Sequence, residues 1–318
     1  MPAVSPPGAV VRLAFACGLA ALVGTVARAD VPRVAIAATP AIAVRVDDDT
    51  LAGRSGKLRA RFVLPLPTGG LFAYLRRLLG DSVEAQPGAN PAVYTAAVGE
   101  SRRPFTYIAM LPFAQKINGR IGGYRIGFWP GERGRAADDP FDAKYGTPAG
   151  FIQVTPDNAE TAVSEHFRLR DFLTHDQARV WPKYLVLDEA LVDKLELVIS
   201  DLRGRGYRAD RLHVMSGFRT PQYNRAGGDP RGRAELSRHQ YGDAADVWVE
   251  NGDGTMADLN GDGRVDAGDA DVLAEAAERV EQAHPELAGG VGVYAGTRAH
   301  GPFVHIDTRG RRARWGAG

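Results

Sequence analysis

The chain has one cysteine, no surplus of either charge and few long apolar runs. Cys17 is the only thiol among 318 residues. Lys and Arg number 39 against 38 Asp and Glu, so the formal net charge is +1. This balance provides no basic excess for a phosphate backbone, and we expect no nucleic-acid partner. Beyond the N-terminal apolar stretch, no run is long enough to span a bilayer.

Residues 1–29 have the pattern of a secretory signal peptide. Arg12 supplies a positive charge, Leu13–Ala27 form an apolar stretch of 15 residues, and Ala27–Ala29 fit a small-x-small cleavage site. The alternatives are an uncleaved anchor and a lipoprotein attached through Cys17. We expect an exported protein of the periplasm or cell envelope, with no stable membrane span after cleavage. Loss of Cys17 would exclude disulfides and a thiol nucleophile.

The rest of the chain divides by its turn residues and apolar periodicity. Residues 30–49 form an N-terminal lead, and residues 50–130 form a small β-rich domain without an assigned role. Residues 131–149 are polar with Gly and Pro, and we interpret them as a linker to a domain at 150–318. In the β-rich part we predict strands within Leu58–Leu66, Tyr107–Phe113 and Gly123–Trp129, and a helix at Leu71–Leu79.

From residue 150 the pattern becomes mixed. Helical periodicity predicts helices at Asp188–Arg205 and Asp271–His284. Short apolar runs predict strands at Leu212–Met215, Ala244–Glu250, Gly292–Tyr294 and Phe303–Asp307. Helices and strands in this order indicate an α+β domain.

The most informative stretch is Ser237–Asp246, with the sequence SRHQYGDAAD. His239 precedes a turn at Gly242, and Asp246 lies in the strand that follows. Imidazole nitrogen and carboxylate oxygen suit Zn²⁺, and His305, centred in an apolar strand, is a candidate third ligand. Three protein ligands would leave an open, catalytic position. A histidine in a strand is more often a core or surface residue, so the residues alone leave both interpretations open.

This stretch resembles the pattern S-x-H-x-x-G-x-A-x-D of the zinc D-alanyl-D-alanine peptidase superfamily. That superfamily includes D,D-dipeptidases and murein endopeptidases and shares its fold with the hedgehog signalling domain. Upstream, SGFRTPQYN at Ser216–Asn224 resembles the motif S-G-[YF]-R-[ST]-P-x-x-N of the superfamily. Downstream, GGVGVY and FVHIDTRGRRARW resemble the end of a murein endopeptidase subfamily. The resemblance covers roughly 165–318 and leaves the N-terminal half uncovered.

The resemblance implies a fold and an activity. The fold is a small antiparallel sheet with flanking helices, here preceded by the β-rich N-terminal domain. The zinc ligands would be His239, Asp246 and His305, and Arg219 would face a substrate carboxylate or the developing oxyanion. The implied activity is zinc-dependent hydrolysis of peptide bonds in peptidoglycan stem peptides or cross-links. The alternatives are a non-catalytic wall-binding module and a calcium-dependent adhesion or scaffold component.

The sequence departs from many relatives at the catalytic base. They place a Glu in E-x-W-H, three residues before the last ligand, where this chain has Pro302. Asp307 shares a strand face with His305, so it is a candidate base or an orienting partner of that ligand. His300 is a second candidate for polarising water or substrate. Of the two, we expect Asp307 to matter more.

Residues 251–270 form an insertion that includes a candidate Ca²⁺ loop, Asp258–Asp269. Oxygen donors fall at the loop positions that calcium ligands occupy, and Gly263 takes the conserved turn position. The donors would be the side chains of Asp258, Asn260, Asp262, Asp266 and Asp269, and the backbone carbonyl of Arg264. The last position is Asp rather than Glu, as in dockerin modules. We expect calcium here to brace the zinc domain; a solvated Gly-Asp surface loop is the alternative.

Overall fold

The computed structural model describes residues 53–63, 86–87, 93–98, 103–133, 145–227, 234–297 and 300–316. All of them belong to one compact unit, residues 42–318. The segments predicted as a signal peptide at 1–29, a lead at 30–49 and a helix at Leu71–Leu79 lie outside the described residues. Within the described residues, no helix has the length and apolar character that crossing a membrane requires.

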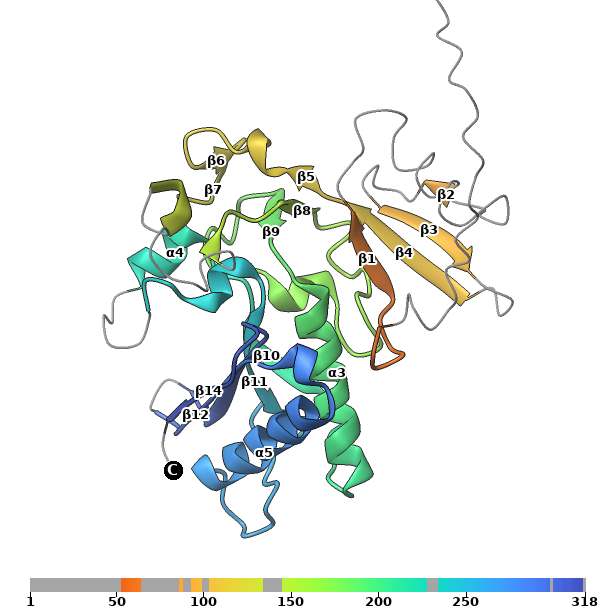
Figure 1. Ribbon diagram of the computed structural model, residues 1–318, viewed down its shortest axis with the longest axis vertical. Coiled ribbons are helices and arrows are strands. Elements are labelled where there is room, and N and C mark those ends of the chain that lie inside the picture. The colour runs from red at the N-terminus through yellow and green to blue at the C-terminus, as the bar shows by residue number, and fades with distance from the viewer. Residues whose placement is uncertain are drawn as a thin grey trace, which may run out of the picture. The chain divides into compact units, whose positions relative to one another are not determined.

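A five-stranded sheet forms the centre of the C-terminal half (Figure 1), in the order β10-β11-β13-β12-β14. Its strands are β10 (Leu212–Ser216), β11 (Ala244–Val249), β12 (Gly290–Tyr294), β13 (Phe303–Asp307) and β14 (Ala313–Gly316). All neighbours are antiparallel except β12 and β14, which pair in parallel. The sheet is thus antiparallel, as expected, except at this edge, where the chain leaving β13 returns along the far side of β12.

Two amphipathic helices pack together beside this sheet. Helix α3 (Glu189–Gly204) begins at the N-cap Asp188, whose carboxylate accepts the amide hydrogen of Ala190. Helix α5 (Ala267–Ala283) begins with a capping box between Asp266 and Asp269. Helix α5 contacts α3 as well as β12 and β13. Both predicted helices are confirmed, α5 starting four residues earlier than expected because its cap belongs to the acidic loop.

Small sheets precede the five-stranded sheet in the sequence. One has the order β1-β4-β3-β2, another β5-β8-β9, and β6 and β7 form a hairpin. Their bounds are β1 Ala60–Val63, β2 Gln86–Pro87, β3 Val93–Val98, β4 Arg103–Ala109, β5 Leu111–Pro112, β6 Arg120–Ile121, β7 Tyr124–Arg125, β8 Gly150–Val154 and β9 Lys183–Leu185. The short helices are η2 Phe113–Gln115, η3 Pro130–Arg133, η5 Leu169–Phe172, α4 Pro221–Ala226, η6 Arg238–Tyr241 and η7 Pro285–Leu287.

The strand expected at Gly123–Trp129 is shorter than predicted. Only Tyr124 and Arg125 pair as a strand. Gly127 has a φ of +87°, and a Cβ there would lie 2.7 Å from the backbone nitrogen of Gln222. The backbone is thus pressed against helix α4, with Gln222 donating its amide hydrogen to the Ile126 carbonyl at 2.9 Å. This close approach ends the strand.

The apolar core is continuous across both halves. Leu58, Ile108 and Trp129 belong to the same cluster of buried residues as Leu191 and Val304. Hydrogen bonds reinforce this packing, as in the pairing of β5 with β8 and the bond from the Arg59 amide to the Val163 carbonyl. The division into a β-rich domain at 50–130 and a zinc domain at 150–318 stays a prediction about independent folding.

Candidate metal centre

Three buried side chains meet at the centre of the five-stranded sheet. His239 comes from η6, Asp246 from β11 and His305 from β13. Asp246 and His305 are direct cross-strand partners. His239 Nε2 lies 3.2 Å from Asp246 Oδ1 and 3.2 Å from His305 Nδ1, and the last two atoms are 3.0 Å apart. The three residues predicted as zinc ligands are thus brought together as one potential metal-binding group.

His239 is oriented from behind by the motif that precedes α4. Its Nδ1 donates to the Gly217 carbonyl at 2.7 Å, which leaves the lone pair of Nε2 directed at the cluster. Gly217 is required by packing, because a Cβ there would lie 2.7 Å from the Cα of Phe172. The glycine of the SGFR sequence therefore allows the close approach that holds the imidazole.

His305 is oriented by a carboxylate. Its Nε2 donates to Asp307 Oδ2 at 3.0 Å, which leaves the lone pair of Nδ1 directed at the cluster. The Asp307 side chain has no exposed surface, and it also accepts from the Gly290 amide at 2.7 Å and from the Arg309 guanidinium. Of the two roles considered for Asp307, this contact favours the orienting one.

Burial and hydrogen bonding set the protonation of the cluster. Burial lowers the pKa of His239 below its ordinary value. Burial has the same tendency at His305, but hydrogen bonds to Asp246 and Asp307 outweigh it and raise the pKa. Burial would raise the pKa of Asp246, but the two imidazoles outweigh it and hold the pKa well below 3.8. The carboxylate is therefore ionised, as a metal ligand must be.

Arg219 braces the carboxylate ligand. Its Nη2 donates to Asp246 Oδ2, the oxygen that does not face the histidines, and its Nε donates to Ser216 Oγ at 2.8 Å. Its amide donates to the His239 carbonyl at 3.0 Å. Arg219 also lines the pocket above the cluster, so one side chain contacts a ligand and faces the cavity.

The turn between His239 and Asp246 depends on Gly242. This residue has a left-handed φ of +72°, and a Cβ would lie 2.2 Å from the Val186 carbonyl oxygen. Gly242 in turn accepts the Asp188 amide at its own carbonyl, at 2.9 Å. The turn is thus seated against the start of α3.

The cluster lies in a pocket of about 490 Å³. Its lining includes Arg219, Tyr294, His300, Phe303, Arg309 and Trp315. Among the described residues that line it, Asp246 is the only carboxylate. His300 lines this pocket, whereas Asp307 is buried on the side of His305 away from the cluster and is absent from the lining. The His300 ring packs edge-on against Phe303, with 5.1 Å between centroids.

The sequence analysis did not identify the aromatic side chains that line this pocket, Tyr294, Phe303 and Trp315. The Trp315 ring lies 5.1 Å from the His305 ring, and its Nε1 donates to the Tyr294 hydroxyl at 2.7 Å. Trp315 fits there because β12 has no side chain at Gly292, where a Cβ would lie 2.3 Å from the indole nitrogen. Alternating glycines at Gly290 and Gly292 were the available signal, since they leave one face of a strand open for a neighbour.

The predicted calcium loop is closed by its own hydrogen bonds. Asp258 accepts from the amides of Gly261 and Gly263, at 2.7 and 2.9 Å. Asp269 is fully buried and accepts from the Leu259 amide at 2.7 Å and the Asp266 amide at 2.9 Å. In the part of the chain that the structure describes, the one cluster of His, Cys, Asp or Glu close enough to share a metal is His239, Asp246 and His305. The calcium site at Asp258–Asp269 stays a prediction.

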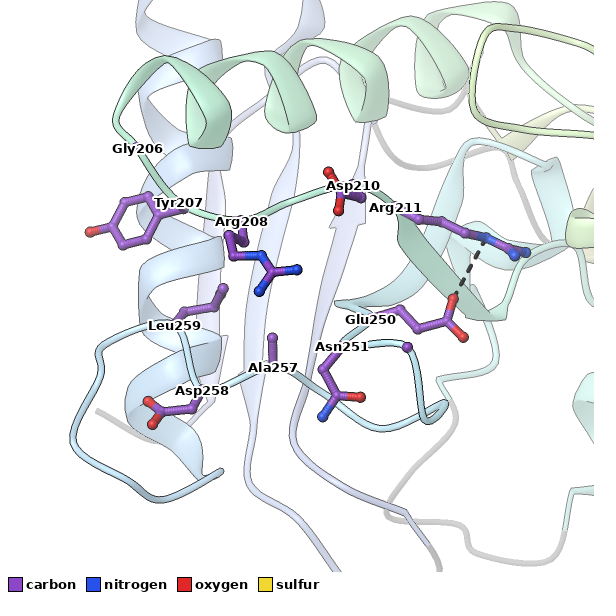
Figure 2. A pocket seen from close by; sticks show the side chains of 11 residues that line it. Gly206, Tyr207, Arg208, Asp210, Arg211, Glu250, Asn251, Ala257, Asp258 and Leu259 are labelled. Carbon is purple, nitrogen blue, oxygen red and sulfur yellow. Dashed lines mark ion pairs between the residues drawn. The ribbon is translucent and has the colours of Figure 1, made fainter.

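A second pocket, of about 570 Å³, lies between the end of α3 and the beginning of this loop. Figure 2 shows it lined by Tyr207, Arg208, Asp210, Asn251 and Asp258, among others. Arg211 and Glu250 form an ion pair at its edge, at 3.7 Å. Its lining mixes basic and acidic side chains and includes none of the predicted zinc ligands.

Residues 189–260 match the family model of Peptidase M15. The matched segment runs from α3 through β11 and contains His239 and Asp246, while His305 lies beyond it. No curated protein matches the chain, and no solved structure matches it. The Peptidase M15 match supports a peptidase of a zinc-dependent family, and the mixed α/β architecture agrees with it.

Proposed function

We propose that this protein is an exported zinc metallopeptidase that hydrolyses peptide bonds in peptidoglycan. The observation that carries the proposal is the convergence of His239 Nε2, Asp246 Oδ1 and His305 Nδ1 within 3.2 Å of one another at the base of a pocket. The family match of residues 189–260 supports the peptidase class. Export is proposed from the signal-peptide pattern of residues 1–29.

The donor set fits zinc. Two imidazole nitrogens and one carboxylate oxygen form a three-ligand set of the kind found in catalytic zinc sites. Each histidine has its other ring nitrogen held by an acceptor, Gly217 O or Asp307 Oδ2. When bound, zinc would polarise the scissile carbonyl and lower the pKa of a water molecule to about 7.

The remaining residues divide the work of binding and proton transfer. Arg219 has the planar, permanently charged fork that suits a substrate carboxylate or a developing oxyanion. His300 in the pocket wall is the residue we assign to proton transfer, since a base must reach the reacting group. Asp307 holds His305 and takes no part in proton transfer.

A non-hydrolytic wall-binding module is the second candidate. The observation favouring it is that Asp246 is the only carboxylate among the described residues lining the pocket, with Pro302 where relatives have the catalytic Glu. Such a module would keep the metal and bind muropeptides without cleaving them. The two candidates thus differ in turnover and agree in metal content.

Metal analysis and product analysis separate these possibilities. We expect one zinc per chain in the wild type, and loss of stoichiometric zinc in His239→Ala and His305→Ala. His284→Ala is the matched control, because His284 caps α5 and lies outside the pocket lining. Full zinc content in both ligand variants would refute the site. Mass spectrometry of defined muropeptides should show cleaved stems or cross-links; zinc-loaded wild type that cleaves none supports the wall-binding module.

A further inference from the structure

A lysine is buried completely in the middle of α3. Lys194 has 0% exposed surface, and its partner Glu281 on α5 has 1% of its side chain exposed. Lys194 Nζ donates to Glu281 Oε1 at 2.7 Å and to the backbone carbonyl of Asp307 at 2.7 Å. Lysines are almost never fully buried unless they are paired, so this arrangement calls for an explanation.

The second bond connects α3 to the metal centre. Asp307 ends β13, and its carboxylate accepts from His305 Nε2 at 3.0 Å. Lys194 therefore holds the backbone of the residue whose side chain orients a ligand. No described residue of α3 lines the pocket itself, so the Lys194 side chain acts on the site from behind the ligands.

Glu281 extends the same arrangement to two more strands. Its Oε1 also accepts from the Gly289 amide at 3.0 Å, next to Gly290, whose amide donates to Asp307 Oδ1 at 2.7 Å. Its Oε2 accepts from the Arg314 guanidinium on β14, the strand that carries Trp315. One buried carboxylate thus secures the start of β12 and the position of β14 behind the site.

Stability alone is a poor reason for such a pair. Removing two charges from water is costly, and replacing a buried ion pair with apolar residues is often neutral or stabilising. What an apolar pair would not supply is a donor to the Asp307 carbonyl and acceptors for Gly289 and Arg314. These are directional bonds, and they converge on the residues that flank His305.

We propose that Lys194 and Glu281 are positioning residues, which fix His305 in its ligand orientation by way of Asp307. This inference rests on the proposed zinc site. Removal of partners that orient a metal ligand typically weakens metal affinity 10- to 100-fold. Lys194 contacts Asp307 rather than His305 itself, so we expect its removal to weaken metal affinity by the lower end of this range, about tenfold.

The test compares two buried lysines. Lys194→Met removes the donor but keeps a long apolar side chain, and Glu281 retains Arg314. Lys183→Met is the control, because Lys183 is also buried, with 5% of its surface exposed. Among the described residues, it donates only to the backbone carbonyls of Asp176 and Gln177. We expect zinc binding about tenfold weaker and an altered visible spectrum of the Co²⁺-substituted protein in Lys194→Met, with neither change in Lys183→Met.

A metal-free measurement separates this inference from the metal site itself. In ¹⁵N spectra of the metal-free wild type, His305 should carry its proton on Nε2, and Lys194→Met should show a mixture of tautomers. Folded Lys194→Met with wild-type zinc affinity, cobalt spectrum and tautomer would overturn the inference. Should Lys194→Met not fold, the same three measurements on the isosteric Glu281→Gln decide. A wild type that binds no zinc, yet shows this dependence of His305 on Lys194, would sink the metal site and leave the positioning intact.

Discussion

Asp246 and Asp307 are both buried carboxylates beside His305, and their partners give them different roles. Asp246 faces the ring nitrogens that converge at the base of the pocket. Asp307 contacts the opposite nitrogen of His305 through Oδ2, and Arg309 donates to both oxygens of the same carboxylate. Burial alone would raise the pKa of Asp307, but hydrogen bonds from His305 and Arg309 outweigh it and lower the pKa. A general base must lie within hydrogen-bonding distance of the reacting group and needs a pKa near the working pH, and Asp307 meets neither condition.

We therefore predict that substitutions of His300 and Asp307 impair different properties, hydrolysis and zinc binding respectively. His300→Ala should keep one zinc and lose about 100-fold or more in hydrolysis, the contribution typical of a general base. Asp307→Asn should weaken zinc binding by about 10- to 100-fold, because the tautomer of His305 is no longer fixed. Zinc content and rate must be measured on the same samples, with His284→Ala as the control. Asp307→Asn with full zinc and no hydrolysis would restore Asp307 as the base.

The lowered pKa of Asp307 also predicts a pH dependence of stability. A carboxylate whose pKa is lowered on folding stabilises the protein fully at pH values above its unfolded pKa of 3.8. That contribution is lost as the pH falls from there toward the lower, folded pKa. Asp307→Asn should cost about 3 kcal/mol in the free energy of unfolding at pH 7, because a buried charge partner of Arg309 is removed.

The difference from wild type should shrink between pH 4 and pH 3 in urea unfolding of the metal-free protein. Asp210→Asn is the control, since that side chain is 86% exposed and should show a difference near zero throughout. A constant difference for Asp307→Asn across this range would show that folding does not lower the pKa of Asp307.

At the scale of elements, local signals predicted the long helices and the inner strands. The apolar residues of α3 repeat at helical spacing and are followed by a Gly, so its bounds were predictable to within one residue. Strand β14 was missed because Ala313–Gly316 has no apolar alternation; it is a strand because it pairs with β12. Helix α4 was missed because it spans only six residues, beginning at Pro221. Both depend on tertiary contacts that local patterns do not encode.

The candidate site likewise contains residues that local sequence patterns identify and residues that only tertiary contacts bring into place. His239, Asp246 and His305 were identified because two of them share a short motif and the third stands in an apolar strand. Arg309 and Trp315 were not, because they reach the pocket through the pairing of β14 and the bend after β13. Lys194 gave a misleading signal: a lysine on a helix is normally solvated, and only the position of Glu281 explains its burial.

The acidic loop before α5 supports a prediction at this scale. If Ca²⁺ binds Asp258–Asp269, it binds the folded chain and should raise the melting temperature by mass action. Asp258→Ala/Asp262→Ala should abolish that response. The control is Asp253→Ala in the neighbouring acidic turn, where Asp253 accepts from the Thr255 amide at 2.8 Å.

Differential scanning calorimetry across a Ca²⁺ titration measures the effect. A response that persists unchanged in the double variant would refute the loop as the site. A wild type that shows no response would mean that the hydrogen bonds of Asp258 and Asp269 alone close the loop.

At the scale of the whole molecule, the N-terminal sheets are joined to the candidate metal centre by packing. Trp129 has 0% exposed surface, and its indole donates to the backbone carbonyl of Gln240 at 2.8 Å, next to His239. The β5–β8–β9 sheet combines strands from both halves. The residues that resemble no family thus contribute part of the core on which the metal centre rests.

This packing makes the domain division testable. A chain beginning at residue 150 would lack Leu58, Ile108 and Trp129 from the shared core. We predict that it loses cooperative unfolding and its zinc. In the full chain, Trp129→Ala should cost about 3–5 kcal/mol in the free energy of unfolding, as expected for a buried aromatic. Phe128→Ala is the control, since Phe128 is 37% exposed and should cost much less. A truncated chain that unfolds cooperatively near the wild-type temperature and binds one zinc would instead establish 150–318 as an independent domain, because its core would then close without the N-terminal strands.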